Sequence, residues 1–209
     1  MTERVIYCAG EQGRVTLSIL RASGDDDGIV FADDDPAVHG ETHDGVPIVG
    51  GIELASDVAP DAPCIVAFGD RPGVRLDLAE SAAREGFEFF SAIHPDTTVS
   101  ETAAIGSGTT VNAQSYLGPN ARLGDHVLVD SCVNLSHDVD VDDGATVTPG
   151  ATLAGGVNVR ADSYVGPGAT VVEDVTVGAE AVVGAGAVVT EDIPPEKTVV
   201  GVPAAPIED

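Results

Sequence analysis

The sequence predicts a small parallel α/β domain followed by a parallel β-helix. Two observations support this fold class. Residues 1–90 alternate short apolar strands with helical segments, whereas the residues that follow repeat with a strict period of six. We therefore expect two domains, 1–92 and 93–209.

Apolar runs bounded by glycine-containing turns predict the strands of the first domain. The expected strands are Arg4–Cys8, Gly28–Ala32, Gly45–Gly50 and Cys64–Gly69, and the expected helices are Arg14–Ser23 and Val74–Gly86. Alternation of this kind implies a parallel sheet that binds ligands at the carboxyl ends of its strands.

Candidate binding residues follow two of these strands. Gly10 and Gly13 would allow a phosphate to approach the N-terminus of the first helix. Asp33 and Asp34 can accept hydrogen bonds from ribose hydroxyls, a uracil N–H or a sugar ammonium, and the alternative is a solvated turn. Arg75, near the start of the last helix, is either a phosphate contact or an ordinary helix charge.

The second domain is defined by its six-residue repeat. Every sixth position from Val99 to Val189 is Val, Ile or Leu, without a single insertion. Three such hexads form one triangular coil, so the sixteen positions predict about five coils, stacked ~4.8 Å apart. Pro194 and Pro195 are expected to end the ladder because proline cannot donate to it.

One histidine interrupts the small, aliphatic and acidic composition of the repeat, in the stretch "NLSHDVD" (Asn134–Asp140). His137 follows the inward Leu135 by two residues, so its side chain should point out of the prism at a turn. Imidazole titrates near ~6.5, which suits a base that removes a proton from an amine or hydroxyl. A solvated surface histidine is the alternative.

Charge and composition exclude several function classes. The chain has 35 acidic and 9 basic residues, a net charge of −26, which excludes electrostatic binding to nucleic acid or an anionic membrane surface. Lys197 is the single lysine, and a lysine-poor acidic surface favours a halophilic origin over a generic acidic protein. Without a signal peptide or an apolar run of membrane-spanning length, the protein is expected to be soluble and cytoplasmic.

The three cysteines, Cys8, Cys64 and Cys132, lie far apart in the sequence. Their spacing forms neither a disulfide framework nor a pair of metal ligands. We therefore expect a reducing compartment and three buried thiols.

Several short segments together resemble a known family: "VIYCAGEQGRV", "FADDDPAVHG", "IHPDTTVSETAAIGSGTTV", "LSHDVDVDDG" and "VVGVPA". Their order and spacing are similar to those of the sugar O-/N-acyltransferases of the sialic acid O-acetyltransferase type, which include the UDP-amino-sugar N-acetyltransferases. The resemblance covers nearly the whole chain. It implies a Rossmann-like nucleotide-sugar-binding domain, a left-handed β-helix, and a homotrimer with active sites between neighbouring β-helices.

The resemblance also implies the chemistry, which is transfer of an acetyl group from acetyl-CoA to a sugar amine or hydroxyl, without a metal. His137 matches the catalytic base, Asp138 the acidic residue that orients it, and Gly155 the backbone N–H that stabilises the oxyanion. Asp33 and Asp34 match positions that contact the nucleotide sugar.

The chain departs from the family pattern at several places, two of which concern the binding of acetyl-CoA. Thr146 stands nine residues after His137, where relatives often carry a second histidine, and no basic residue follows "GVPA". Arg160 is a candidate partner for the CoA phosphates, although an ordinary surface charge is the favoured alternative. A non-catalytic trimeric scaffold that binds a nucleotide sugar is therefore an alternative. A gamma-type carbonic anhydrase is a further one, although His126 and His137 lack a third histidine at suitable spacing.

Overall fold

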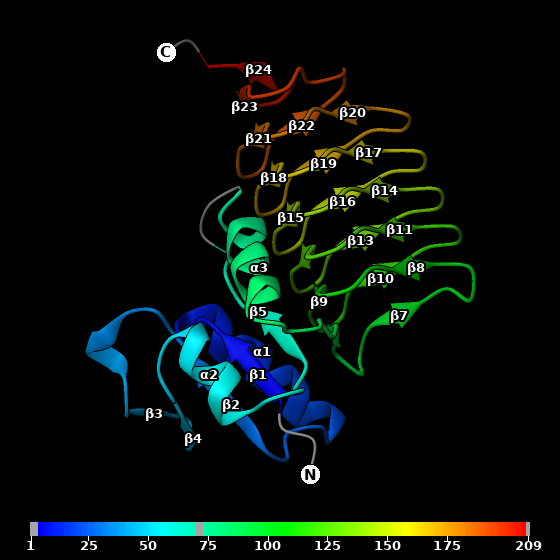
Figure 1. Ribbon diagram of the computed structural model, residues 1–209. Coiled ribbons are helices and arrows are strands. Elements are labelled where there is room, and N and C mark those ends of the chain that lie inside the picture. Colours follow the sequence, from blue (N-terminus) through cyan, green and yellow to red (C-terminus); the bar gives the residue numbers. More distant parts are fainter. Residues whose placement is uncertain (1–3, 70–72, 208–209) are drawn as a thin grey trace. The chain divides into compact units, whose positions relative to one another are not determined.

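The computed structural model describes residues 4–69 and 73–207. The chain divides into two compact units, Met1–Pro95 and Asp96–Asp209 (Figure 1). The sequence placed the boundary after residue 92.

The N-terminal unit is built on a three-stranded parallel sheet in the order β2-β1-β5, with bounds β1 (Arg4–Tyr7), β2 (Ile29–Ala32) and β5 (Cys64–Val66). Alternate residues of β1 face opposite sides, Ile6 toward one apolar cluster and Val5 and Tyr7 toward the other. The helix α1 (Glu11–Ser23) packs on the first side, and α2 (Ile52–Val58) and α3 (Val74–Arg84) pack on the second. The predicted small parallel α/β unit is confirmed.

One predicted strand of this unit is divided between the sheet edge and a hairpin. Ile48 bridges Phe31 of β2 in parallel, and the Val49 N–H donates to the Phe31 carbonyl at 2.9 Å. Within Gly45–Gly50 only β4 (Val46–Pro47) is a strand, and it pairs antiparallel with β3 (Thr42–His43) after the short helix η1 (Pro36–Val38). Pro47 has no N–H to donate, so this segment is poorly suited to a central position in the sheet. The strand β6 (Ala92–Ile93) contributes Ala92 to the cluster beneath α1.

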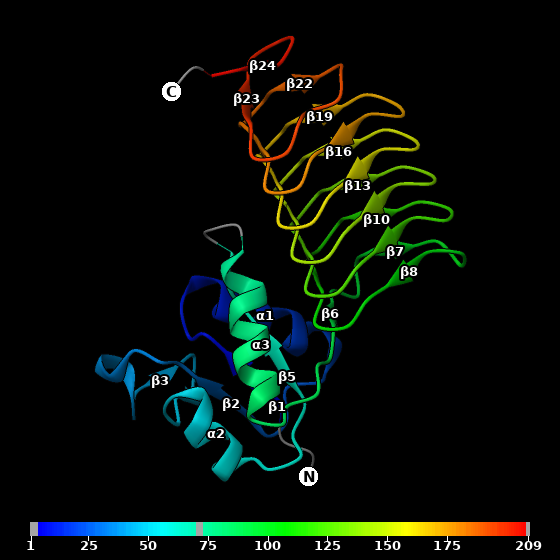
Figure 2. The ribbon, with the colours of Figure 1, turned by 45° about the horizontal axis from the view of Figure 1, so that its top comes forward.

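The C-terminal unit is a parallel β-helix whose coils stack along one axis (Figure 2). Face one contains β7 (Thr98–Val99), β10 (Tyr116–Leu117), β13 (Asn134–Leu135), β16 (Thr152–Leu153), β19 (Thr170–Val171) and β22 (Val188–Val189). Face two contains β8 (Ala104–Ile105), β11 (Arg122–Leu123), β14 (Asp140–Val141), β17 (Asn158–Val159) and β20 (Thr176–Val177). Face three contains β9 (Thr110–Val111), β12 (Leu128–Val129), β15 (Thr146–Val147), β18 (Tyr164–Val165), β21 (Val182–Val183) and β23 (Thr198–Val200), with β24 (Ala205–Pro206) antiparallel to β23.

Residues 18 apart in the sequence stack directly on one another in this unit. Leu117 pairs in register with Leu135, which pairs with Leu153, and all three side chains are fully buried. The residues that the structure describes form five complete coils and a sixth, in which β22 and β23 supply two faces and Ile193 bridges Val177 on the third. The β-helix therefore has about six coils, where the sequence predicted about five. The ladder nevertheless continues through β23 beyond Pro194 and Pro195, because these prolines lie in the connection that precedes the strand.

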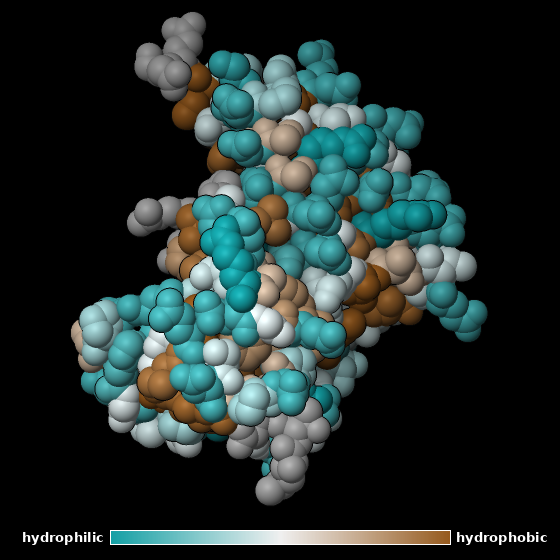
Figure 3. Space-filling model, viewed as in Figure 1, coloured by the Kyte–Doolittle hydropathy of each residue, from teal (hydrophilic) through white to brown (hydrophobic). Residues whose placement is uncertain are grey.

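Polar residues lie at the surface, and hydrophilic side chains cover much of the face shown in Figure 3. No helix within residues 4–69 and 73–207 has the length and apolar character needed to span a membrane. The expectation of three buried thiols is wrong for Cys132, which is exposed. This residue stands at a corner of the prism with a φ of +59°, where side chains point outward.

Candidate active site

His137 lies at the corner between face one and face two. Three stacked residue pairs form this corner, and we call it the His137 corner: Pro119–Asn120, His137–Asp138 and Gly155–Gly156. The second member of each pair adopts a positive φ, +61° for Asn120, +57° for Asp138 and +71° for Gly156. Since Leu135 fills the interior, the chain turns outward after it, and the His137 side chain is 64% exposed as predicted.

Asp138 joins two side chains of the corner. Its Oδ2 lies 2.9 Å from Nδ1 of His137, and its Oδ1 accepts a hydrogen bond of 2.9 Å from Nδ2 of Asn120. These bonds, first from Asn120 and then from His137, lower the pKa of Asp138 below its ordinary value. The ionised carboxylate can only accept, so this contact favours a proton on Nδ1 of His137, and in the neutral ring Nε2 is then the acceptor.

Gly155 lies one coil after His137, directly against its ring. A Cβ at position 155 would lie 2.5 Å from Nε2 and 2.3 Å from Cε1 of His137, so this close approach requires glycine. The N–H of Gly156 donates to the His137 carbonyl at 3.1 Å. Within the described ranges the Gly155 N–H makes no hydrogen bond. A free backbone donor therefore stands beside the imidazole.

A polar cleft of about 480 Å³ adjoins the corner on face two. Asn120, Asp138 and Gly156 contribute one wall, and the residues of the neighbouring strands contribute the rest: Arg122, Val139, Asp140 and Asn158. Arg122 places a cation close to the carboxylates of this cleft.

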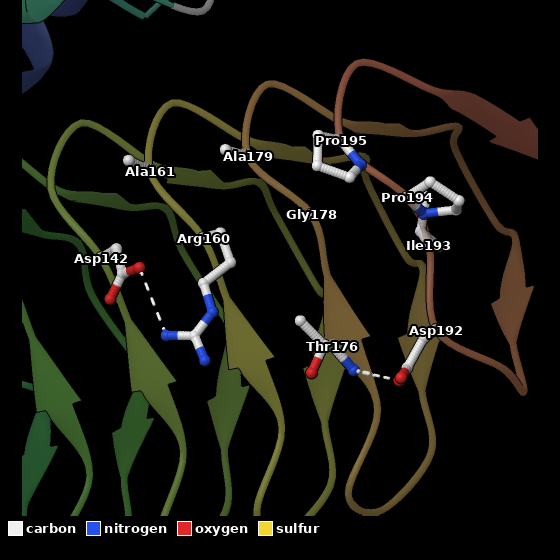
Figure 4. Close-up of a pocket in the computed structure, with 10 residues that line it drawn as sticks. All are labelled: Asp142, Arg160, Ala161, Thr176, Gly178, Ala179, Asp192, Ile193, Pro194 and Pro195. Atoms are coloured by element: carbon white, nitrogen blue, oxygen red, sulfur yellow. Dashed lines mark hydrogen bonds and ion pairs between the residues drawn. The ribbon is translucent and has the colours of Figure 1, made fainter.

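A second pocket of about 560 Å³ lies on face two toward the C-terminus (Figure 4). Arg160 stands one coil after Asp142, and its Nη1 lies 3.4 Å from Oδ2 of that residue. Much of the remaining lining is small or apolar: Ala161, Gly178, Ala179, Ile193, Pro194 and Pro195. An arginine beside an apolar wall suits a ligand that carries both a phosphate and a flat ring.

In the N-terminal unit, Asp33 and Asp34 hold the carboxyl ends of the strands together. Asp33 accepts the N–H of Ala9 at 2.8 Å and that of Asp35 at 2.9 Å. Asp34 accepts the Tyr7 hydroxyl and, at 3.1 Å, the N–H of Ile52 at the start of α2. Asp34 also lines a pocket of about 390 Å³ together with His39, Gly51, Ile52, Glu53, Leu54 and Ser81.

Gly10 and Gly13, which follow β1, differ in whether the fold requires glycine at that position. A Cβ on Gly13 would lie 2.2 Å from the Cys8 carbonyl oxygen, so glycine lets α1 pack against the end of β1. Gly10 precedes α1 and has open space around its Cα, which leaves this helix N-terminus accessible. Burial, and after it Asp33 and Asp34, raise the pKa of Cys8 to about 12, so its thiol stays protonated and unreactive.

The Arg75 side chain is not at the surface. It is 4% exposed, and its Nη1 donates to the Phe68 carbonyl at 2.6 Å, which ties the start of α3 to the end of β5. The structure therefore brings Gly10, Asp33 and Asp34 to the carboxyl end of the sheet and gives the Arg75 guanidinium a contact within the fold.

Comparison with solved structures identifies the family. A GDP-perosamine N-acetyltransferase from Caulobacter crescentus, in complex with CoA and GDP-perosamine, has a TM-score of 0.92 and 31% identity, covering 99% of this chain and 97% of that one. The acetyltransferase domain of PglB from Neisseria gonorrhoeae, in complex with acetyl coenzyme A, has a TM-score of 0.92 and 35% identity, covering 99% of both chains. The chain belongs to the nucleotide-amino-sugar N-acetyltransferases of the hexapeptide-repeat type. The predicted acyltransferase and left-handed β-helix are thus confirmed.

Two other comparisons carry no functional argument. No protein-family model matches the chain. A stretch of 69 residues is 34% identical to the co-chaperonin GroES of Streptococcus thermophilus, but it covers only 33% of this chain and 73% of that protein. The acetyltransferase structures cover 99% of the chain, so the assignment rests on them.

Thr146, where relatives often carry a second histidine, lies on another face of the β-helix. It is buried on β15, on face three, and does not replace a second histidine at the His137 corner. Residues 4–69 and 73–207 contain no group of three or more His, Cys, Asp or Glu side chains that could hold a metal ion. Asn120 was not predicted, although it lies 18 residues, one full coil, before Asp138 and could have been found from the repeat.

Proposed function

We propose that this acetyltransferase moves the acetyl group of acetyl-CoA to the amine of a nucleotide-linked amino sugar, with His137 as the general base. The observation that carries the proposal is the exposed His137–Asp138 pair with the Gly155 backbone against the imidazole ring. Asp138 orients the ring, and the Gly155 N–H is the oxyanion donor.

The proposed reaction follows from the positions of these groups. The amine nitrogen attacks the thioester carbonyl while Nε2 of His137 takes a proton from that nitrogen. The carbonyl oxygen becomes a tetrahedral oxyanion, which accepts a hydrogen bond from the Gly155 N–H. The C–S bond then breaks, and the imidazolium returns its proton to the departing CoA sulfur. The products are the N-acetylated sugar and free CoA.

The two substrates need separate binding regions. We assign the nucleotide end of acetyl-CoA to the pocket beside Arg160, because its cation and apolar wall match a phosphate and an adenine ring. We assign the nucleotide sugar to the carboxyl end of the α/β sheet, near Gly10, Asp33 and Asp34, with Gly13 shaping the turn. Arg75 remains a predicted residue of this site. Because its side chain is buried, it would act by holding the start of α3 in place rather than by contacting the ligand from the surface.

The assembly and location predicted from sequence also remain proposals. In a homotrimer, the exposed His137 corner would face a neighbouring β-helix, which would exclude water from the reacting groups. The neighbouring structures bind CoA and GDP-perosamine or acetyl coenzyme A. We propose the same classes of substrate here, in the cytoplasm of a halophilic organism.

A thiol-release assay with acetyl-CoA tests the proposed function. The acceptors are UDP- and GDP-linked amino sugars, the matching nucleotide sugars that carry only hydroxyls, and sialic acid, all in concentrated KCl. We expect thiol release with a nucleotide amino sugar and a product whose mass rises by one acetyl group. Binding of a nucleotide sugar without binding or consumption of acetyl-CoA would favour the non-catalytic scaffold.

A further inference from the structure

We infer that Asn120 is a positioning residue for the reaction, which acts through Asp138 to hold His137 in its basic tautomer. The inference rests on the proposed function and extends it by one residue. Asn120 does not contact the imidazole, but its Nδ2 donates to Oδ1 of Asp138 at 2.9 Å, and Oδ2 of Asp138 meets Nδ1 of His137 at 2.9 Å.

The fold places Asn120 for this contact. Asn120 stands one coil before Asp138 at the same corner, and its own N–H donates to Oγ1 of Thr102, one coil earlier again, at 2.9 Å. Its φ of +61° is a conformation that asparagine tolerates better than most residues. Two successive coils, carrying Thr102 and Asn120, therefore stack beneath the catalytic pair His137–Asp138.

The contact matters because Asp138 is otherwise loosely held. Its side chain is 57% exposed, and the next coil offers only Gly156 at the same corner position, which has no side chain to hold the carboxylate. Arg122 and Asp140 line the adjoining cleft, so Arg122 is available to attract a released carboxylate away from His137. With Oδ1 fixed by Asn120, Oδ2 stays directed at Nδ1 of His137.

The tautomer of His137 is the chemical consequence. A carboxylate held at Nδ1 keeps the proton on that nitrogen and leaves Nε2 free to accept one. If Asp138 turns away, the proton can occupy Nε2 instead, and the ring then cannot act as a base from its outward nitrogen. Asn120 thus contributes to turnover without touching either substrate.

Two substitutions distinguish this role from a structural one. Asn120→Gly removes the donor and keeps a residue that accepts a positive φ without strain. Asn120→Asp keeps the shape of asparagine but replaces the donor with a second carboxylate, which repels the carboxylate of Asp138. A packing role predicts that the isosteric Asp variant is the milder of the two, whereas donation to Asp138 predicts that it is the more severe.

We expect kcat to fall about ten-fold in Asn120→Gly and further in Asn120→Asp, with unchanged KM for both substrates. Gln114→Gly is the matched control, because Gln114 is an exposed neutral amide at another corner of the same coil, with a φ of +62°. It should leave kcat unchanged. In an Asp138→Gly background, Asn120→Gly should cause no further loss, since its partner is gone.

The deciding experiment measures the tautomer directly and does not depend on acetyl transfer. Nitrogen-15 NMR of histidine-labelled protein, with the His137 signals identified by their absence from His137→Ala, reports which ring nitrogen carries the proton. We expect an Nδ1-protonated ring in the wild-type protein and a mixture shifted toward Nε2 protonation in Asn120→Gly. The same tautomer in both proteins, or an Asp variant more active than the Gly variant, overturns the inference. Absence of acetyl transfer by the wild type would instead count against the proposed function.

Discussion

The two units both carry acidic residues predicted for the site, but they use these residues differently. Asp138 bonds two side chains, His137 and Asn120, at an exposed corner of the β-helix. Asp33 and Asp34 bond mostly backbone N–H groups, and Asp34 also accepts from the buried Tyr7 hydroxyl. Under the proposed function the acidic residue at the corner serves chemistry, whereas the acidic pair at the sheet end first connects segments of the fold.

The difference follows from how each unit satisfies its backbone. In the β-helix, backbone N–H groups pair with carbonyls of the neighbouring coil, as Asn134 N in β13 does with the Ala151 carbonyl at 2.9 Å. Some corner side chains still accept backbone N–H groups, as Thr102 does from Asn120 and Asp143 does from Asp125, whereas Asp138 bonds other side chains. The α/β unit has irregular loops at its strand ends, and their N–H groups need side-chain acceptors. Substitutions in the two units should therefore separate activity from stability.

The largest expected effect is that of His137→Ala on turnover. Loss of a general base typically lowers the rate by about 10²–10⁴-fold, and we expect kcat for acetyl transfer to fall within this range. Thermal stability should stay unchanged, because the side chain lies outside the core and the backbone contacts of the coil remain. Steady-state kinetics and a thermal melt measure both quantities. Turnover close to that of the wild type would remove His137 from the mechanism.

Asp34→Ala should have a smaller effect, mainly on stability. It leaves the buried Tyr7 hydroxyl and the Ile52 N–H without their acceptor, which costs about 1–3 kcal/mol in the free energy of unfolding. Adding Tyr7→Phe to this variant removes the stranded hydroxyl and should restore part of that loss. Denaturant unfolding of the single and double variants provides the measurement. Equal stability of Asp34→Ala and the wild type would show that the acid is not needed for the fold.

Arg160→Gln should have the smallest effect, confined to the acetyl donor. Loss of one charged contact to a phosphate should raise the KM for acetyl-CoA about ten-fold. The KM for acetyl-pantetheine, which lacks the nucleotide, should not change. Arg84→Gln is the control, because Arg84 pairs with Glu80 on the exposed surface of α3. An equal rise in KM for both donors would place the nucleotide end of CoA elsewhere.

The β-helix was predictable from sequence because the place of each residue in a coil follows from its position in the six-residue repeat. The period of six placed Leu135 inside and His137 outside before any coordinates were known, and the 18-residue coil stacks Asn120 beneath Asp138 in the same way. What the repeat could not supply was the side-chain rotamers. The approach of the His137 ring to Gly155 and the hydrogen bond from Asn120 depend on torsion angles that no periodicity encodes.

The α/β unit was predictable only to the level of strands and helices. Asp33 and Asp34 were correctly placed at the end of a strand, but their partners Ala9, Tyr7 and Ile52 come from three separate segments. Tertiary packing brings these segments together, and no pattern in the sequence indicates which residues will meet. The segment around Pro47 was assigned to the sheet from its apolar composition. Ile48 does bridge Phe31 at the sheet edge, whereas Val46 and Pro47 pair with the hairpin strand β3.

The most direct test of this account measures kcat and the thermal midpoint for His137→Ala and Asp34→Ala side by side. We predict opposite patterns. His137→Ala should lose turnover at an unchanged midpoint. Asp34→Ala should have a lowered midpoint but keep its kcat at saturating nucleotide sugar, below its own melting range, because a lost contact at the proposed nucleotide-sugar site raises KM rather than lowering kcat. If Asp34→Ala instead loses turnover at an unchanged midpoint while His137→Ala stays active, the assignment of chemistry to the His137 corner is wrong.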